Sequence, residues 1–264
     1  MTGVVALNQS QAHPFDGRFT LRPTPNLTVF CDFDGPIIDV SDRYYNTYQL
    51  ALADVQTAYQ DKGAPLPLCL LSKTHFWQMK QDRVPDLEIA LRSGLRQEQM
   101  DYFLQRVCSI VNQPALLHQD HLQPGVRWAL ELLHSQGVRL VLVTLRSQEQ
   151  ATEILQSYGL ANLFTLIRGT QDDTVAYGNA AESKIQLLAE VLQEFPHWAT
   201  EPAWMIGDTE ADILAGQASN IPTIALTCGI RSQTYLEKFL PTRIHSELLS
   251  AAHYLVSQSL FASV

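Results

Sequence analysis

From about residue 125 onward, short apolar segments alternate with longer amphipathic ones. The apolar segments have the length of single strands and read VRLVLVTL (138–145), LFTLIR (163–168), AWMIGD (203–208) and IPTIALT (221–227). Segments such as SQEQATEILQSYG and ESKIQLLAEVLQEF lie between them and carry apolar residues at helical spacing. Strands that alternate with helices favour a parallel sheet. The alternation therefore predicts a Rossmann-like open parallel α/β core with helices on both faces.

The first half of the chain follows a different pattern. After the strand-like segment LTVFCDFD (27–34), residues 40–122 contain no convincing strand and read as helices that break at glycines and prolines. We therefore expect an all-helical cap domain at 40–122, inserted into a core domain formed by residues 27–39 and 123–264. Residues 1–26 lack the pattern of a secretion signal, and we expect them to be a lead-in without function.

The composition argues against two classes of partner. The formal net charge is −9, whereas a nucleic-acid-binding face needs clustered lysines and arginines. No apolar run approaches the roughly 20 residues of a membrane span. The four cysteines show no paired or zinc-binding spacing, which is typical of reduced thiols in a cytoplasmic protein. We expect a cytoplasmic monomer or homodimer that binds neither nucleic acid nor membrane but can still bind a small anion locally.

Several reactive or metal-binding side chains stand at the ends of predicted strands or the starts of predicted helices. They are Asp32, Asp34, Thr144, Lys184, Asp208 and Asp212. The carboxyl ends of parallel strands open on one crevice, so these side chains are expected to lie close together. Carboxylate oxygens hold Mg²⁺, which also joins phosphate oxygens, and a lysine with a hydroxyl can neutralise and orient a phosphoryl group. The pattern indicates a site for a divalent cation and a phosphoryl group.

Four segments in order carry a family resemblance. They resemble the four motifs of the haloacid dehalogenase-like hydrolase superfamily and read VFCDFDGPI, VLVT, a helix-initial Lys184 and MIGDTEAD. The resemblance covers about residues 27–230, and the helical block stands where the phosphoglycolate phosphatase and β-phosphoglucomutase branch carries its cap. It implies a Mg²⁺-dependent phosphatase that hydrolyses a small phosphorylated metabolite through an aspartyl-phosphate intermediate.

The resemblance also implies roles in the reaction. Asp32 would be the nucleophile, and Asp34 would act as the general acid and then as the general base. Thr144 and Lys184 would hold the phosphoryl oxygens, and Lys184 would also offset the repulsion between the acidic side chains and the phosphate.

Magnesium is the cofactor that the resemblance implies. Its ligands would be Asp32, the backbone carbonyl of Asp34 and Asp208. Asp212 would either orient Asp208 or a metal-bound water, or be a further ligand of the metal.

Other cations are candidates for substrate contacts. In the cap, the segment SKTHFWQMKQDR places Lys73, Lys80 and Arg83 around apolar residues. These cations either contact the distal group of an anionic substrate, as lids do when they complete a pocket, or lie in solvent on the polar face of a helix. Arg146 stands where small or amide residues are common in the family, and it either reaches the substrate or is a solvated residue at a helix start. Arg231 is a further candidate at the rim.

Two alternatives stay open. A β-phosphoglucomutase-like phosphosugar mutase shares every core residue and differs in retaining a bisphosphate intermediate instead of admitting water. A non-catalytic binding protein that kept the fold is an alternative of another class, although the reactive residues are all retained.

Overall fold

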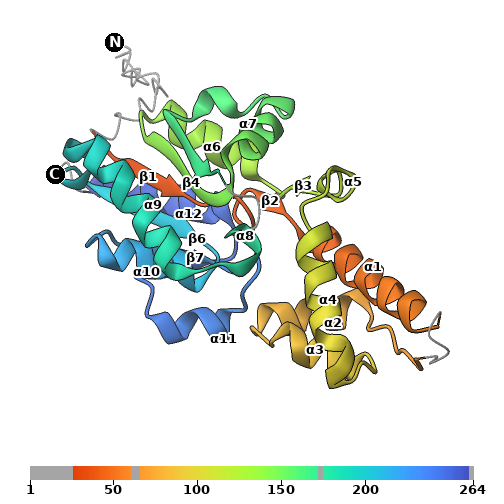
Figure 1. Cartoon of the computed structure of the whole chain (residues 1–264). Coiled ribbons are helices and arrows are strands. Elements are labelled where there is room, and N and C mark those ends of the chain that lie inside the picture. Colours follow the sequence, from red (N-terminus) through yellow and green to blue (C-terminus); the bar gives the residue numbers. More distant parts are fainter. Residues whose placement is uncertain (1–25, 61–65, 172–174, 262–264) are drawn as a thin grey trace, which may run out of the picture.

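A parallel sheet forms the centre of the computed structural model, which describes residues 26–60, 66–171 and 175–261. The sheet has six strands in the order β5-β4-β1-β6-β7-β8, and all neighbours pair in parallel (Figure 1). The strands are β1 (Thr28–Cys31), β4 (Arg139–Ser147), β5 (Leu166–Thr170), β6 (Ala203–Gly207), β7 (Thr223–Leu226) and β8 (Arg243–His245). The predicted α/β class is confirmed.

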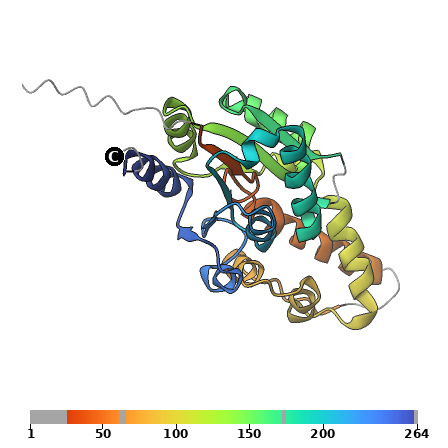
Figure 2. The same cartoon turned by 90° about the vertical axis from the view of Figure 1, so that its left-hand side faces the viewer.

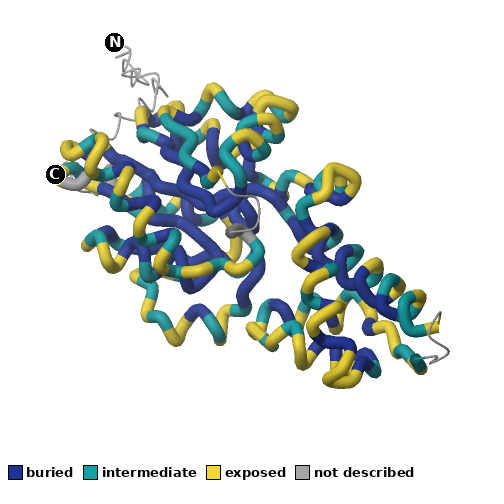
Figure 3. The backbone as a smooth tube through the Cα atoms, in the orientation of Figure 1, coloured by how far each residue is buried: buried dark blue, intermediate teal, exposed yellow. Residues whose placement is uncertain are grey.

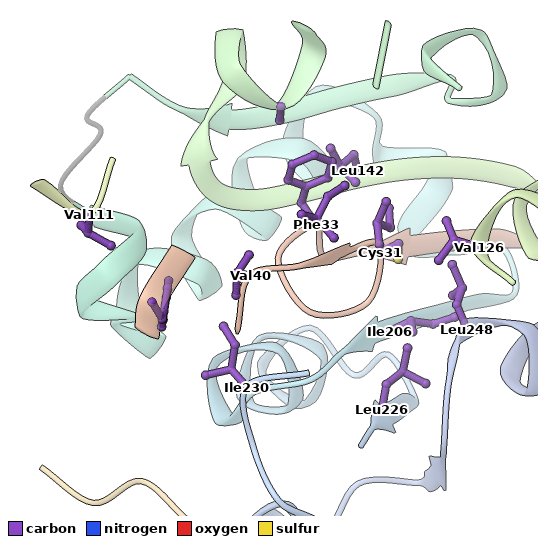
Figure 4. Packing of buried hydrophobic residues seen from close by; sticks show 14 of the residues in the cluster. Cys31, Phe33, Val40, Val111, Val126, Leu142, Ile206, Leu226, Ile230 and Leu248 are labelled. Atoms are coloured by element: carbon purple, nitrogen blue, oxygen red, sulfur yellow. The ribbon is translucent and has the colours of Figure 1, made fainter. Parts of the chain in front are cut away.

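Helices cover both faces of the sheet, because successive strand side chains point to opposite faces. Cys31 and Leu142 belong to the apolar cluster of one face, and Figure 4 shows Cys31 close to Val126 and Leu142 close to Phe33. Phe30 belongs to a separate cluster on the other face. The helices of the first face are α6 (Val126–Ser135), α7 (Gln148–Ser157) and α12 (Leu248–Phe261), and those of the second are α9 (Ala181–Glu194) and α10 (Glu210–Ala218) (Figure 2).

The chain leaves the core and returns to it through two short paired strands. These are β2 (Ile38–Asp39) and β3 (His121–Leu122), which pair antiparallel. The helices between them are α1 (Ser41–Gln60), α2 (Lys73–Gln81), α3 (Asp86–Arg92), α4 (Gln97–Ile110) and α5 (Pro114–Leu117). They lie to one side of the sheet in Figure 1, and Figure 3 shows buried backbone that continues from the sheet into α1. The division into core and cap domains stays a prediction, and residues 1–25 of the predicted lead-in lie outside the described residues.

Most helices and strands lie where the sequence predicts them, and a few short strands differ. The run at 163–168 predicts a strand, but its first residue, Leu163, is the last residue of a 3₁₀ turn, η1 (Ala161–Leu163), and β5 begins only at Leu166. The strands β2, β3 and β8 were not predicted, because two or three residues are too few to show an apolar period. The remaining short elements are α8 (Val175–Gly178), η2 (Pro196–Ala199), α11 (Gln233–Leu236) and η3 (Glu237–Phe239).

The helix α1 shows why the cap residues fold as they do. Asp39 accepts a hydrogen bond from the Ser41 N–H at 2.8 Å, which satisfies a free donor of the first turn. The buried side chains of α1 include Tyr44, Tyr48 and Val55, which recur at helical spacing and pack against the rest of the core cluster.

No helix within the described ranges has both the length and the apolar character needed to cross a membrane.

Candidate active site

The carboxyl ends of β1, β4 and β6 meet beside a small cavity. Asp32 follows β1, Thr144 lies towards the end of β4, and Asp208 follows β6. Asp32 and Thr144 line the cavity, and the helices α1 and α2 contribute Tyr44 and Lys80 to its lining. The cavity has a volume of about 30 Å³, which holds about one or two waters and not a phosphorylated metabolite.

Three buried carboxylates form one cluster. Oxygens of Asp32, Asp208 and Asp212 all lie within 4.8 Å of one another. Burial and the nearby Asp212 carboxylate raise the pKa of Asp32 to about 7, and burial with the charges of Asp212 and Asp32 raises the pKa of Asp208 well above its usual value. The Asp208 Oδ1 atom has no hydrogen-bond partner among the described residues. A divalent cation would supply the missing partner and the missing positive charge, so this oxygen-rich cluster fits Mg²⁺.

Three glycines allow the carboxylates to lie so close to the backbone. A Cβ atom at Gly35 would lie 2.1 Å from Asp208 Oδ2, and one at Gly229 would lie 2.0 Å from the same oxygen. A Cβ atom at Gly207 would lie 2.1 Å from Asp212 Cγ. Gly35 also has a φ of +98°, which other residues rarely adopt. The acid cluster therefore depends on backbone without side chains around it.

Lys184 supplies the positive charge inside the cluster. It lies in the first turn of α9 and is 1% exposed. Its Nζ atom donates to Asp32 Oδ1 at 2.7 Å and to the Val143 carbonyl at 2.9 Å, and it lies 3.1 Å from Asp212 Oδ1. Burial alone would lower its pKa, but Asp212 and Asp32 raise the pKa of Lys184 above its usual value. Lys184 is therefore charged and holds one oxygen of Asp32 in place.

Asp34 lies beside two buried arginines. Its Oδ2 atom accepts a hydrogen bond from Arg43 Nη2 at 3.0 Å, and its Oδ1 atom lies 3.4 Å from Arg146 Nε. The backbone N–H of Arg146 donates to Thr144 Oγ1 at 3.1 Å. The side chain of Thr144 is buried against the same cavity. The loop after β1, the helix α1 and the strand β4 thus bring the acid, the two arginines and the hydroxyl together as neighbours.

A comparison with known families agrees with this arrangement. The sequence model of the family described as haloacid dehalogenase-like hydrolase matches residues 29–226, which include the whole acid cluster and Lys184. The chain belongs to the haloacid dehalogenase-like hydrolase family.

Curated relatives and solved structures give more detail. A phosphoglycolate phosphatase of Aliivibrio fischeri is 36% identical over 114 residues, which are 42% of this chain and 47% of the relative. The chain thus spans about half the length of this relative. The pyrophosphatase PpaX of Halalkalibacterium halodurans is 22% identical over 216 residues, which cover 81% and 89% of the two chains. A putative phosphatase structure from Clostridium difficile has a TM-score of 0.64 at 18% identity and covers 87% of this chain and 99% of its own, which shows a shared fold.

The predicted substrate contacts of this haloacid dehalogenase-like protein separate into two groups. Lys80, Arg83 and Arg146 line the cavity, and so does Arg231. Lys73 does not: its side chain is 41% exposed and pairs with Asp42 at 2.7 Å. Lys73 therefore follows the solvent alternative. The solvated alternative for Arg146 is wrong, because this residue is 2% exposed within β4.

Lys80 is held in the cavity wall by residues that the sequence did not single out. Its Nζ atom donates to Asp86 Oδ1 at 2.8 Å and to the Tyr177 hydroxyl at 3.3 Å. The Tyr177 hydroxyl donates to Asp86 Oδ2 at 2.8 Å, and burial lowers the pKa of Lys80. Glu210 likewise pairs with Arg231 at 2.9 Å and with Arg83 at 3.1 Å. Asp86 is only six residues from Lys80, but Tyr177 lies 97 residues away, and Glu210 is likewise far from Arg83 in the sequence, so no local pattern indicates these two partners.

Arg43 is also a residue that the sequence reading missed, although a signal was present. It is 1% exposed and lies on the buried face of α1, where Thr47, Ala51 and Val55 follow at four-residue spacing. A charged residue on an otherwise buried helix face needs a partner, because burial of an unpaired charge is costly. That position alone could have marked Arg43 for attention.

Proposed function

We propose that this chain is a Mg²⁺-dependent phosphatase that hydrolyses a small phosphorylated metabolite through phosphorylation of Asp32. The observation that carries the proposal is the buried cluster of Asp32, Asp208 and Asp212 with Lys184 bound to Asp32. The cluster suits a divalent cation, and the lysine fixes the carboxylate that would attack.

Magnesium would be held by the carboxylates of Asp32 and Asp208 and by the backbone carbonyl of Asp34. Asp212 would orient the site, because its Oδ2 atom already accepts hydrogen bonds from the Thr209 N–H at 3.1 Å and hydroxyl at 2.8 Å. When bound, the cation would offset the negative charge that gathers between the acids and the phosphoryl group.

The side chains of this chain account for both chemical steps. An Asp32 oxygen attacks phosphorus, the bond to the leaving oxygen breaks, and Asp34 gives that oxygen its proton. A water then attacks the phosphorus of phosphorylated Asp32, Asp34 takes a proton from the water, and phosphate leaves with Asp32 regenerated. Thr144 and Lys184 hold phosphoryl oxygens during both steps.

The cavity suggests that the substrate carries a second negative group. Four cations besides Lys184 line a space of about 30 Å³, which is smaller than a phosphorylated metabolite. We expect the cap helices to move when a substrate enters. Arg146 adds a specific argument, because its Nη1 atom is buried without a hydrogen-bond partner. A small phosphorylated acid would satisfy it. We therefore propose 2-phosphoglycolate as the first substrate to test, on the strength of this cation set and of the names of relatives.

The proposal is tested with a panel of phosphate esters. Phosphate release is measured with 2-phosphoglycolate, several sugar phosphates and pyrophosphate, with and without Mg²⁺, for the wild type and Asp32→Asn. We expect release from at least one small substrate that requires Mg²⁺ and is lost in Asp32→Asn. Pyrophosphate is included because one relative of similar length is a pyrophosphatase.

Other outcomes would favour the alternatives. A rearranged sugar phosphate that accumulates without free phosphate would point to a mutase. Binding of a phosphate ester without turnover, equal in wild type and Asp32→Asn, would point to a binding protein and contradict the proposal.

A further inference from the structure

A buried ionic network connects Asp34 to both ends of the cap insertion. Arg43, in the first turn of α1, uses each of its nitrogen atoms. Nε donates to Asp120 Oδ1 at 2.9 Å, and Nη2 donates to Asp34 Oδ2 at 3.0 Å. Nη1 donates to Asn112 Oδ1 at 2.9 Å and to the Val111 carbonyl at 3.3 Å. A guanidinium held through all three of its nitrogen atoms has one defined position.

Asp120 completes the network from the other side. Its Oδ1 atom accepts from Arg43, and its Oδ2 atom accepts from Arg146 Nη2. Asp120 is 6% exposed, and both arginines are almost fully buried. Two arginines and two aspartates thus balance in charge, and Asp120 keeps both guanidinium groups beside Asp34.

The network lies at the place where the cap helices join the sheet. Arg43 stands just after β2, and Asp120 stands directly before β3, which pairs with β2. Asp34 belongs to the core side, in the loop after β1, where it forms an isolated bridge with Ile38. Any movement of α1 relative to the sheet therefore changes the distance between the Arg43 guanidinium and the Asp34 carboxylate.

The two oxygens of Asp34 have different surroundings. Arg43 holds Oδ2, whereas Oδ1 has no hydrogen-bond partner within the described part of the chain, although Arg146 Nε lies 3.4 Å away. Asp34 lines the cavity together with Asp32 and Thr144. The bond from Arg43 fixes the rotation of the carboxylate and leaves Oδ1 as the oxygen that can exchange a proton.

We infer that Arg43, supported by Asp120, is a positioning residue that sets the Asp34 carboxylate for proton transfer when α1 is docked as in this structure. This inference rests on the proposed phosphatase function. Arg43 itself is not among the residues that line the cavity. It acts through Asp34 and makes proton donation to the leaving group depend on the position of the cap helices.

The test compares two substrates whose leaving groups differ in how much they need a proton from the general acid. An alkyl phosphate such as 2-phosphoglycolate, or glycerol 2-phosphate if the panel favours it, leaves as a strongly basic oxygen and requires the general acid. p-Nitrophenyl phosphate leaves as a stable phenolate and needs little protonation. kcat/KM covers the steps up to phosphorylation of Asp32 and excludes the later attack by water. It therefore reports how strongly each leaving group needs a proton from Asp34.

For Arg43→Gln we expect kcat/KM to fall about 100-fold with the alkyl phosphate and less than about threefold with p-nitrophenyl phosphate. Because water attack also needs Asp34, mixing with p-nitrophenyl phosphate should give a burst of p-nitrophenol followed by slow turnover. Asp120→Asn, which is nearly isosteric, should show the same selective loss and covers the case in which Arg43→Gln does not fold. Arg43→Lys should recover part of the activity with the alkyl phosphate.

Two controls separate positioning from general damage. Arg106→Gln removes another cap arginine, which pairs with Asp54 at 2.7 Å on the outside of α1 and α4, and should leave both values unchanged. In an Asp34→Asn background, Arg43→Gln should cause no further loss, since both changes remove the same function. Equal losses with both substrates, or no loss, would overturn the inference while the phosphatase proposal stands. A wild type without Mg²⁺-dependent activity on any substrate of the panel would overturn both.

Discussion

Glycines near the acid cluster should make the proposed metal site sensitive to a single methyl group. We expect Gly229→Ala to displace the Asp208 carboxylate, because the new Cβ atom would lie 2.0 Å from its Oδ2 atom. Mg²⁺ affinity should fall at least about tenfold, measured by titration calorimetry. Gly178→Ala is the matched control, since no atom lies within 4 Å of its added Cβ. Equal affinities for both variants and the wild type would contradict this account of the site.

Lys184 is expected to matter for stability as well as for activity. Lys184→Gln keeps the size of the side chain but leaves Asp32 and Asp212 without their cation in a buried site. Without Mg²⁺ at about pH 8, the free energy of unfolding should fall by about 3–5 kcal/mol, measured by urea denaturation. Addition of Mg²⁺ should restore part of it. A variant as stable as the wild type in the absence of metal would show that the three groups are not coupled.

The helix α10 carries its own N-terminal support. The Thr209 side chain caps the helix, and Asp212 accepts from the Thr209 backbone and hydroxyl in return. Thr209→Ala should lower the free energy of unfolding by about 1 kcal/mol, whereas Thr209→Ser should stay close to the wild type. Chemical denaturation of the three proteins measures the difference. An alanine variant with unchanged stability would mean that the cap contributes nothing.

Helices and strands in which apolar residues recur at a regular spacing could be predicted from the sequence. Contacts between segments that are distant in the sequence could not. The apolar runs before Asp32 and Asp208 predicted β1 and β6, and the position of acids after these runs indicated the site. One partner of Arg43 is Asp120, which is 77 residues away, and no local pattern joins the two. The same holds for Tyr177 and Asp86, which are 91 residues apart. Such pairs depend on how the cap helices dock on the sheet.

The stability of the whole molecule should depend on pH and on Mg²⁺ together. The pKa of Asp32 is about 7 in the folded protein, against the usual 3.8. The folded state therefore holds this proton more tightly, and the stability it contributes is fully present below about pH 4 and is lost as the pH rises through about 7. Mg²⁺ needs the deprotonated carboxylates, so its stabilising effect grows over the same range.

This dependence can be measured by urea denaturation. The increase in the midpoint on addition of Mg²⁺ should be larger at about pH 8 than at about pH 5. Asp32→Asn should reduce the difference between the two pH values. An effect of Mg²⁺ that is the same at both pH values would contradict a metal site built on these carboxylates.

In the proposed reaction, Asp32 carries the phosphoryl group. Peptide mass spectrometry after rapid acid quenching of the protein with Mg²⁺ and the best substrate of the panel detects this group. We expect one phosphoryl group on the peptide that contains Asp32, absent without Mg²⁺ and absent in Asp32→Asn. Turnover of the substrate with no phosphoryl group on that peptide, and undiminished turnover in Asp32→Asn, would contradict it.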